Sequence, residues 1–161
     1  MSEGSARLLG EGGGEGGGAL GSDLCVNETE GATALASALT KRALPSLERL
    51  LVDNNPLGDV GLAALLPALR QLPPLKGLNL YETNIGDEGV ASLVAQPTAG
   101  KLKSLKKLDV YGNQITDAGC ATLATALRGG ALLALEELKL YFNPASQQAK
   151  KDVKDALSAR Q

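Results

Sequence analysis

One pattern of apolar and polar positions occurs four times along the chain. In each copy, positions 1, 4, 6 and 11 are apolar and position 9 is Asn or Thr. The copies are Leu47–Leu57, Leu75–Ile85, Leu105–Ile115 and Leu135–Ala145. Their first residues are separated by 28, 30 and 30 residues, and a period of this length is typical of proteins built from stacked repeats.

The first half of each copy predicts a short β-strand. Apolar and polar residues alternate through positions 4 to 6, which turns one face of a strand inward. The Asn or Thr at position 9 follows the strand, where backbone groups no longer have a neighbouring strand to bond. We therefore expect this side chain to point inward and to bond the backbone of the turn.

The residues between the copies predict α-helices. An Asp-x-Gly triplet begins three of these segments, at Asp59–Gly61, Asp87–Gly89 and Asp117–Gly119. We expect the Asp carboxylate to cap free amides at a helix start, and the Gly to allow the helix to approach the strands closely. Apolar residues at helical spacing then follow: Leu62, Leu65, Leu66 and Leu69; Val90, Leu93 and Val94; Leu123, Ala126 and Leu127.

Stacking is required because one strand–helix unit cannot bury both of its apolar faces alone. The sequence thus predicts an α/β solenoid, a right-handed β-α superhelix of about four to five repeats. Short parallel strands would form its concave face and helices its convex face. Aromatic residues make up only 2% of the chain, which suits small repeated layers better than one large central core.

The two ends of the predicted repeat domain, residues 22–161, are unequal. Residues 146–160 form an amphipathic, strongly polar segment that we interpret as a C-terminal capping helix. Residues 22–46 resemble a degenerate first repeat, with Leu24–Val26 as a short strand and Gly31–Leu39 as its helix. This half-repeat shields the stack poorly, so the chain is either the end of a longer array or contacts a partner through this end.

Residues 1–21 are interpreted as a flexible tail. Gly10–Gly18 consists only of Gly and Glu and cannot bury enough apolar area to offset its ordering entropy. A GxGxxG pattern falls within Gly12–Gly17, but a dinucleotide site needs a strand before it and a helix after it, and neither is predicted.

Composition removes several kinds of chemistry. The chain has no histidine, which excludes histidine-based nucleophile systems, HExxH zinc sites and histidine-ligated haem. Cys25 and Cys120 are far apart and read as isolated thiols of a reducing compartment. We expect no catalytic residues, cofactor or metal. Without a signal-peptide pattern or a long apolar stretch, we also expect a cytoplasmic protein that does not bind membranes.

The few aromatic residues occur at one repeat position. Tyr81, Tyr111 and Tyr141 are thirty residues apart at position 7, and Phe142 follows the last of them. On parallel strands about 4.8 Å apart, the tyrosines would form a stacked ladder on the concave face. Two interpretations remain open: a contact site for a partner, since Tyr is favoured at interfaces, or a structural stripe that shelters the sheet.

Charged residues are also expected on this face. Outward strand positions carry six acidic and five basic residues: Glu48, Asp53, Glu82, Asp109, Glu136, Glu137, and Arg49, Lys76, Lys106, Lys107, Lys139. Such balance, with a net charge of −2 for the chain, disfavours nucleic acid and suits a mixed protein surface. Beside the tyrosines and Phe142, we take as candidate contacts Arg49, Asp53, Glu82, Asp109 and Lys139.

The strand–Asn–helix unit, repeated every 28 to 30 residues, resembles the ribonuclease-inhibitor-like subtype of leucine-rich repeats. Similar arrays occur in ribonuclease inhibitor, Ran GTPase-activating proteins and NOD-like receptors. The resemblance implies a non-enzymatic module that binds a protein partner, of unspecified identity, on its concave face.

The same resemblance leaves two alternatives open. The first is regulation of a small GTPase, for which Arg49 is the sole candidate arginine on the predicted concave face, although no activator motif surrounds it. The second is a fragment of a longer sensor; the GxxxxGK[ST] motif of a nucleotide-binding domain does not occur in this sequence.

Overall fold

Strands and helices alternate along the computed structural model, which describes residues 4–7, 28–41, 47–95 and 102–160. The elements are β1 (Gly4–Arg7), α1 (Glu28–Lys41), β2 (Leu47–Leu51), α2 (Gly58–Leu69), β3 (Gly77–Asn79), α3 (Asp87–Val94), β4 (Lys107–Asp109), α5 (Asp117–Arg128), β5 (Glu137–Lys139) and α6 (Gln147–Ser158). Their order confirms the predicted strand–helix unit.

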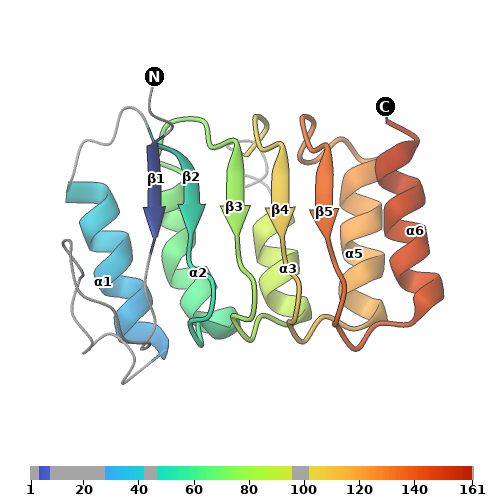
Figure 1. Cartoon of the computed structure of the whole chain (residues 1–161), viewed down its shortest axis with the longest axis horizontal. Helices are drawn as coiled ribbons and strands as arrows, with labels where there is room; N and C mark the ends of the chain where they lie inside the picture. Colours follow the sequence, from blue (N-terminus) through green and yellow to red (C-terminus); the bar gives the residue numbers. More distant parts are fainter. Residues whose placement is uncertain (1–3, 8–27, 42–46, 96–101, 161) are drawn as a thin grey trace.

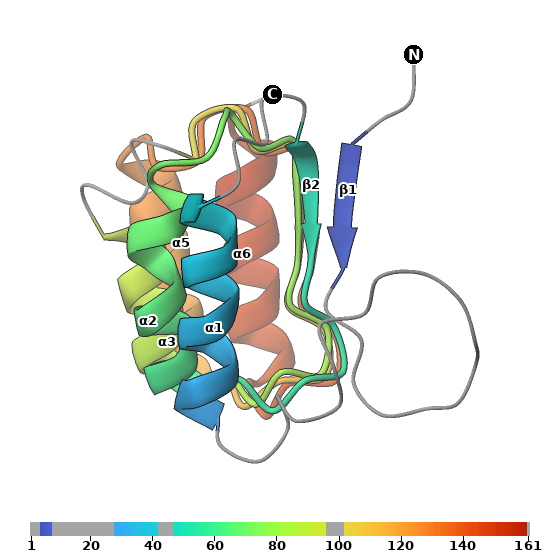
Figure 2. The ribbon, with the colours of Figure 1, turned by 90° about the vertical axis from the view of Figure 1, so that its left-hand side faces the viewer.

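The strands form one parallel sheet in the order β1-β2-β3-β4-β5. Equivalent repeat positions pair across it, so that Leu50 is aligned with Leu78, Leu78 with Leu108, and Leu108 with Leu138. The strands lie side by side in front of the helices in Figure 1, and the side view in Figure 2 separates a layer of strands from a layer of helices. The chain is thus an α/β solenoid of about four to five repeats.

The core lies between the two layers and is built from the repeated apolar positions. Leu50, Leu78 and Leu108 are at most 2% exposed, and the helix residues Leu62, Leu93 and Leu123 are equally inaccessible. Burying one such side chain contributes about 1.5–3 kcal/mol. Because each layer of leucines packs on the next one, the repeats stabilise one another.

The side chains at position 9 point inward, as predicted. Asn113 is 2% exposed; its Oδ1 accepts the backbone N–H groups of Thr83 (3.1 Å) and Ile85 (3.0 Å), and its Nδ2 donates to Leu80 O (2.7 Å). Asn143 Oδ1 likewise accepts Ile115 N–H at 3.0 Å. These amides therefore satisfy the turn of the preceding repeat as well as their own.

The Asp at each helix start has a different partner from the one expected of a simple cap. Its carboxylate accepts the backbone N–H of the residue just before the next helix: Asp59 from Gly86 (2.6 Å), Asp87 from Thr116 (2.8 Å) and Asp117 from Ser146 (2.6 Å). This bond lowers the pKa of Asp117 below 3.8, with Ser146 as the main cause. The Asp series therefore links each repeat to the following one.

The glycines of the Asp-x-Gly triplets leave room for this link. A Cβ added at Gly89 would overlap the Asp59 carboxylate, and one at Gly119 would overlap the Asp87 carboxylate. Close approach is thus required, as predicted, and the neighbours are the Asp of the preceding repeat and the Ile before the helix, Ile85 or Ile115.

The N-terminal end contains one strand that the sequence pattern did not indicate. Strand β1, Gly4–Arg7, falls within residues 1–21, which were interpreted as a tail, and it pairs with β2 through Ala6 and Leu50 and through Arg7 and Leu51. Helix α1 contains the predicted helical segment Gly31–Leu39. Leu24–Val26 and Gly10–Gly18 lie outside the described residues.

Helix α6 confirms the helix predicted near the C-terminus. Ser146 Oγ accepts Ala149 N–H at 3.2 Å at its start, and Val153, Ala156 and Leu157 are buried. Within the part of the chain that the structure describes, no helix combines the length and apolar character needed to cross a membrane.

Candidate protein-binding face

The sheet presents one face to the helices and the other away from them, and we call the second the open face. The alternation of strand residues brings positions 3, 5 and 7 of each repeat to it. These residues are Arg49, Leu51, Asp53; Gly77, Asn79, Tyr81; Lys107, Asp109, Tyr111; Glu137, Lys139 and Tyr141. It corresponds to the surface that the sequence analysis called concave.

Three aromatic rings form a continuous row on this face. The ring centroids of Tyr81 and Tyr111 are 5.1 Å apart with planes at 24°, and those of Tyr111 and Phe142 are 4.9 Å apart with planes at 37°. The predicted ladder of three tyrosines is therefore corrected, because Phe142 stands where Tyr141 was expected. We call Tyr81, Tyr111 and Phe142 the aromatic row.

The residue at position 5 explains why Tyr141 differs from the other two tyrosines. Asn79 Oδ1 accepts Tyr81 N–H (3.0 Å), and Asp109 Oδ1 accepts Tyr111 N–H (3.1 Å). The equivalent residue in the last repeat is Lys139, which has no acceptor atom on its side chain. Its ammonium instead pairs with Asp109 at 3.1 Å, and Tyr141 remains 67% exposed.

Position 8 of each repeat adopts left-handed backbone geometry. The φ angles are +57° at Asn54, +49° at Glu82, +67° at Gly112 and +56° at Phe142. A large side chain is uncommon in this region and costs about 1–2 kcal/mol. Phe142 nonetheless occupies it, with its ring against Tyr111 and 76% exposed.

Glu82 lies alongside the row. A Cβ at Gly112 would lie 2.7 Å from Glu82 Cγ, so the absence of a side chain there makes room for Glu82. Glu82 is the main reason that the pKa of Tyr81 is raised above 10.0. Tyr81 therefore stays protonated at physiological pH and keeps its donor.

Ion pairs join neighbouring strands at the other end of the open face. Lys76 and Glu48 are 2.5 Å apart, Lys106 and Glu136 2.9 Å, and Lys107 and Glu137 2.9 Å. The Lys107 ammonium lowers the pKa of Glu137, and Asp109 raises that of Lys139. The pairs are largely exposed and contribute little to stability, so a partner can replace them at small cost.

A hollow of about 430 Å³ lies among these charges. Gly77 forms part of its floor, because it has no side chain at position 3, where the other repeats carry Arg49, Lys107 and Glu137. The side chain of Arg49 lies beside it, with Cγ 3.2 Å from the position of a Cβ on Gly77. Sequence reasoning missed this hollow, although a lone Gly at an outward position was a visible signal.

The remaining candidate contact residues differ in how accessible they are to a partner. Asp109 and Lys139 form one of the cross-strand pairs, and Arg49 and Glu82 flank the hollow and the aromatic row. Asp53 is only 8% exposed and accepts a hydrogen bond from Asn54 Nδ2 at 3.2 Å, so it lies beneath the surface that a partner would touch.

Cys120 offers no reactive thiol. It is fully buried, and burial raises its pKa to about 11. Its sulfur therefore stays protonated and fills core space. Among residues 4–7, 28–41, 47–95 and 102–160, no cluster of three or more acidic or cysteine side chains is arranged to hold a metal ion.

Comparison with known families agrees with this architecture. The model of the Leucine Rich repeat family matches residues 43–66, 71–94 and 101–124, and no curated protein matches the chain. Together with the fold, these three matches show that residues 43–66, 71–94 and 101–124 are leucine-rich repeats within an α/β solenoid. Such repeats generally mediate protein–protein interaction and are generally not enzymes.

Proposed function

We propose that this protein is a non-enzymatic interaction module that binds a protein partner on its open face, with the aromatic row at the centre of the contact. The observation that carries this proposal is the row itself. The chain has three Tyr and one Phe, and three of these four rings contact one another in a line on the surface.

Physical arguments favour a contact role over a purely structural one for Phe142. An exposed ring in left-handed geometry costs free energy, and burial in the core does not offset that cost. Tyr and Phe are enriched at interface centres. Rings already held by their neighbours lose little further freedom on binding, which favours affinity.

The charges around the row support a protein ligand rather than nucleic acid. Acidic and basic side chains alternate across the strands and pair with one another, so no uniform positive field arises. We place the chain in the ribonuclease-inhibitor-like subtype because its units combine a strand with an α-helix, with a period of 28 to 30 residues. A cytoplasmic location completes this proposal.

Phe142→Gly tests the proposal without a confounding loss of stability. Glycine adopts φ of +56° freely, so the relief of backbone strain offsets the lost contact with Tyr111 and the thermal midpoint should stay close to that of the parent. In affinity capture from source cells followed by mass spectrometry, we expect Phe142→Gly and Tyr111→Ala to lose a protein that the parent retains.

Val60→Ala is the matched control. Val60 is 65% exposed but lies in helix α2, away from the open face. It should retain the captured protein. Equal retention by Phe142→Gly and the parent would contradict a contact centred on the aromatic row.

A further inference from the structure

Backbone bonds between successive repeats follow a strict pattern. In each inner repeat, the N–H groups at positions 6 and 8 donate to the following repeat. The bonds are Val52 to Asn79 O (3.1 Å), Leu80 to Asp109 O (2.8 Å) and Val110 to Lys139 O (3.0 Å), and Asn54 to Tyr81 O (2.8 Å), Glu82 to Tyr111 O (3.0 Å) and Gly112 to Tyr141 O (3.0 Å).

The last repeat has the same two donors without acceptors. They are the N–H groups of Leu140 and Phe142, and neither has a hydrogen-bond partner among the residues that the structure describes. In a parallel sheet, alternate residues direct their backbone groups to opposite sides of a strand. These two N–H groups therefore point away from β4, toward the open edge of β5, where a further strand can add.

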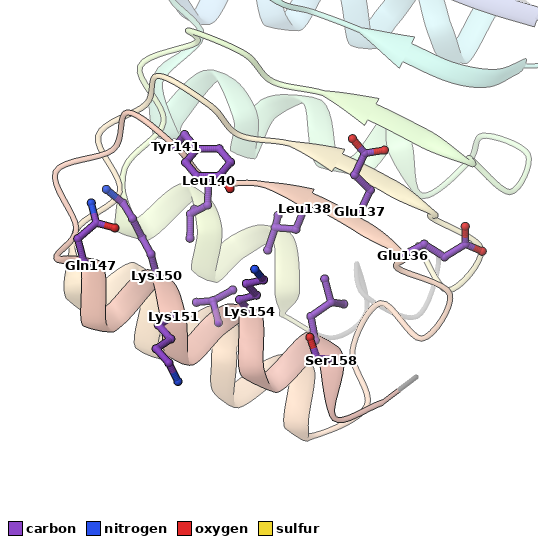
Figure 3. A pocket seen from close by; sticks show the side chains of 12 residues that line it. Glu136, Glu137, Leu138, Leu140, Tyr141, Gln147, Lys150, Lys151, Lys154 and Ser158 are labelled. Carbon is purple, nitrogen blue, oxygen red and sulfur yellow. The ribbon is translucent and has the colours of Figure 1, made fainter.

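A hollow of about 440 Å³ lies next to this edge, between β5 and α6 (Figure 3). Leu138, Leu140, Val153 and Leu157 give it an apolar wall. Leu138 is half-buried, whereas its counterparts Leu78 and Leu108 are each 2% exposed under the next repeat. The hollow is thus where inward-facing side chains of an added strand would lie.

Two lysines distinguish this end from an ordinary junction between repeats. Lys150 and Lys154 of α6 occupy the repeat positions that Cys120 and Ala124 occupy in α5, thirty residues earlier. The side chains of Cys120 and Ala124 are buried, with 0% and 2% exposure. Lys150 Nζ donates to Asn143 O at 2.7 Å, while Lys154 is exposed and has no acceptor among the described residues. Another apolar repeat stacked here would bury both ammonium groups at high cost.

We propose that this edge binds an extended segment of a protein partner, which adds as a sixth strand beside β5. The N–H groups of Leu140 and Phe142 would bond its carbonyl oxygens, and apolar side chains at every second position would enter the hollow. A carboxylate of the segment would pair with Lys154. Main-chain bonds give such contacts affinity and the side-chain pockets give them specificity. This surface shares only Phe142 with the aromatic row, through its backbone N–H and not its ring, and does not depend on the proposed role of the open face.

The test begins with a phage-displayed library of random twelve-residue peptides, selected on the whole protein. We expect enrichment of peptides that alternate apolar residues and carry Asp or Glu. An enriched peptide, once synthesised, should slow amide hydrogen exchange at Leu140 and Phe142, measured by NMR. In the free protein these two amides should exchange much faster than those of Val110 and Gly112.

Charge reversal sharpens the test. Lys154→Glu should weaken binding of the peptide about tenfold, because it replaces an attraction with a repulsion. Lys76→Glu is the control: it makes the same charge reversal at an exposed lysine away from the edge of β5, where Lys76 pairs with Glu48, and should leave affinity unchanged.

Four results would overturn the proposal. They are failure to enrich acidic, alternating peptides; peptides that bind without protecting Leu140 and Phe142; equal affinity of Lys154→Glu and the parent; and protection of both amides in the peptide-free protein that rises with its concentration. The last result would assign the edge to a second copy of the chain. Lys154→Glu leaves the aromatic row intact and Tyr111→Ala leaves the edge of β5 intact, so these two variants let the two proposals fail separately.

Discussion

The inner repeats and the last repeat share one pattern and yet differ in what surrounds it. Around β4, which pairs with β3 on one side and β5 on the other, each repeated side chain has a neighbour on both sides, and Leu108 and Asn113 are each 2% exposed. Around β5, the same positions have a neighbour on one side only, and Leu138 is more exposed than Leu108. Neighbouring repeats, more than residue type, therefore decide what a position contributes.

The largest expected difference concerns the core leucines. Leu108→Ala should lower the free energy of unfolding by about 3–4 kcal/mol, because it leaves a cavity between two filled layers. Leu138→Ala, at the half-buried equivalent position, should cost about 1–2 kcal/mol. Urea unfolding of both variants measures the gap. Equal losses would contradict the view that the terminal layer is only half covered.

Substituting the asparagines should also destabilise the inner repeat more than the last one, but the difference in the free energy of unfolding should be smaller. Asn113→Ala leaves the buried N–H groups of Thr83 and Ile85 without an acceptor and should cost about 2–3 kcal/mol. Asn143→Ala leaves only the Ile115 N–H group without an acceptor and should cost about 1–2 kcal/mol. The same unfolding series tests this order, and a larger loss for Asn143→Ala would reverse the comparison.

The smallest effect should come from giving the last repeat an inner-repeat residue. Lys139→Asn supplies the side-chain acceptor that Asn79 and Asp109 provide at Tyr81 and Tyr111. We expect Tyr141 N–H to gain protection in hydrogen exchange, with stability changed by less than about 0.5 kcal/mol. Lys139→Gln, whose longer side chain places its acceptor one bond further away, serves as the control. Equal protection in both variants would argue against position 5 as the cause.

The sequence was sufficient to predict the repeat period, the strand–helix order and the inward Asn, because each rests on a local pattern of side chains. Leu50, Leu78 and Leu108 were predicted to face inward and do so. The partner of Asp59 was beyond this reasoning, since Gly86 lies 27 residues further on and only the stacked structure brings them together. Strand β1 was also missed because Gly4–Arg7 has no apolar alternation.

For the candidate site, the sequence identified the aromatic positions but not their arrangement. Phe142, and not Tyr141, completes the aromatic row because Lys139 cannot accept the hydrogen bond that Asp109 accepts from Tyr111 N–H, and because the backbone of Phe142 is left-handed. Neither property is visible in an apolar–polar pattern. The terminal hollow was unforeseen for a similar reason. Its lysines suggested only a polar cap until their positions were aligned with Cys120 and Ala124.

The carboxylate links from Asp59, Asp87 and Asp117 each connect one pair of adjacent repeats and no others. Cohesion is therefore nearest-neighbour in range, and no residue that the structure describes serves as a common centre for the repeats. A defect at one junction, such as a methyl group added at Gly119, would overlap the Asp87 carboxylate and weaken the contact between the β3–α3 and β4–α5 units, and it would also press on Ile115 within the β4–α5 unit. The stack would then separate into two shorter blocks instead of losing its order everywhere at once.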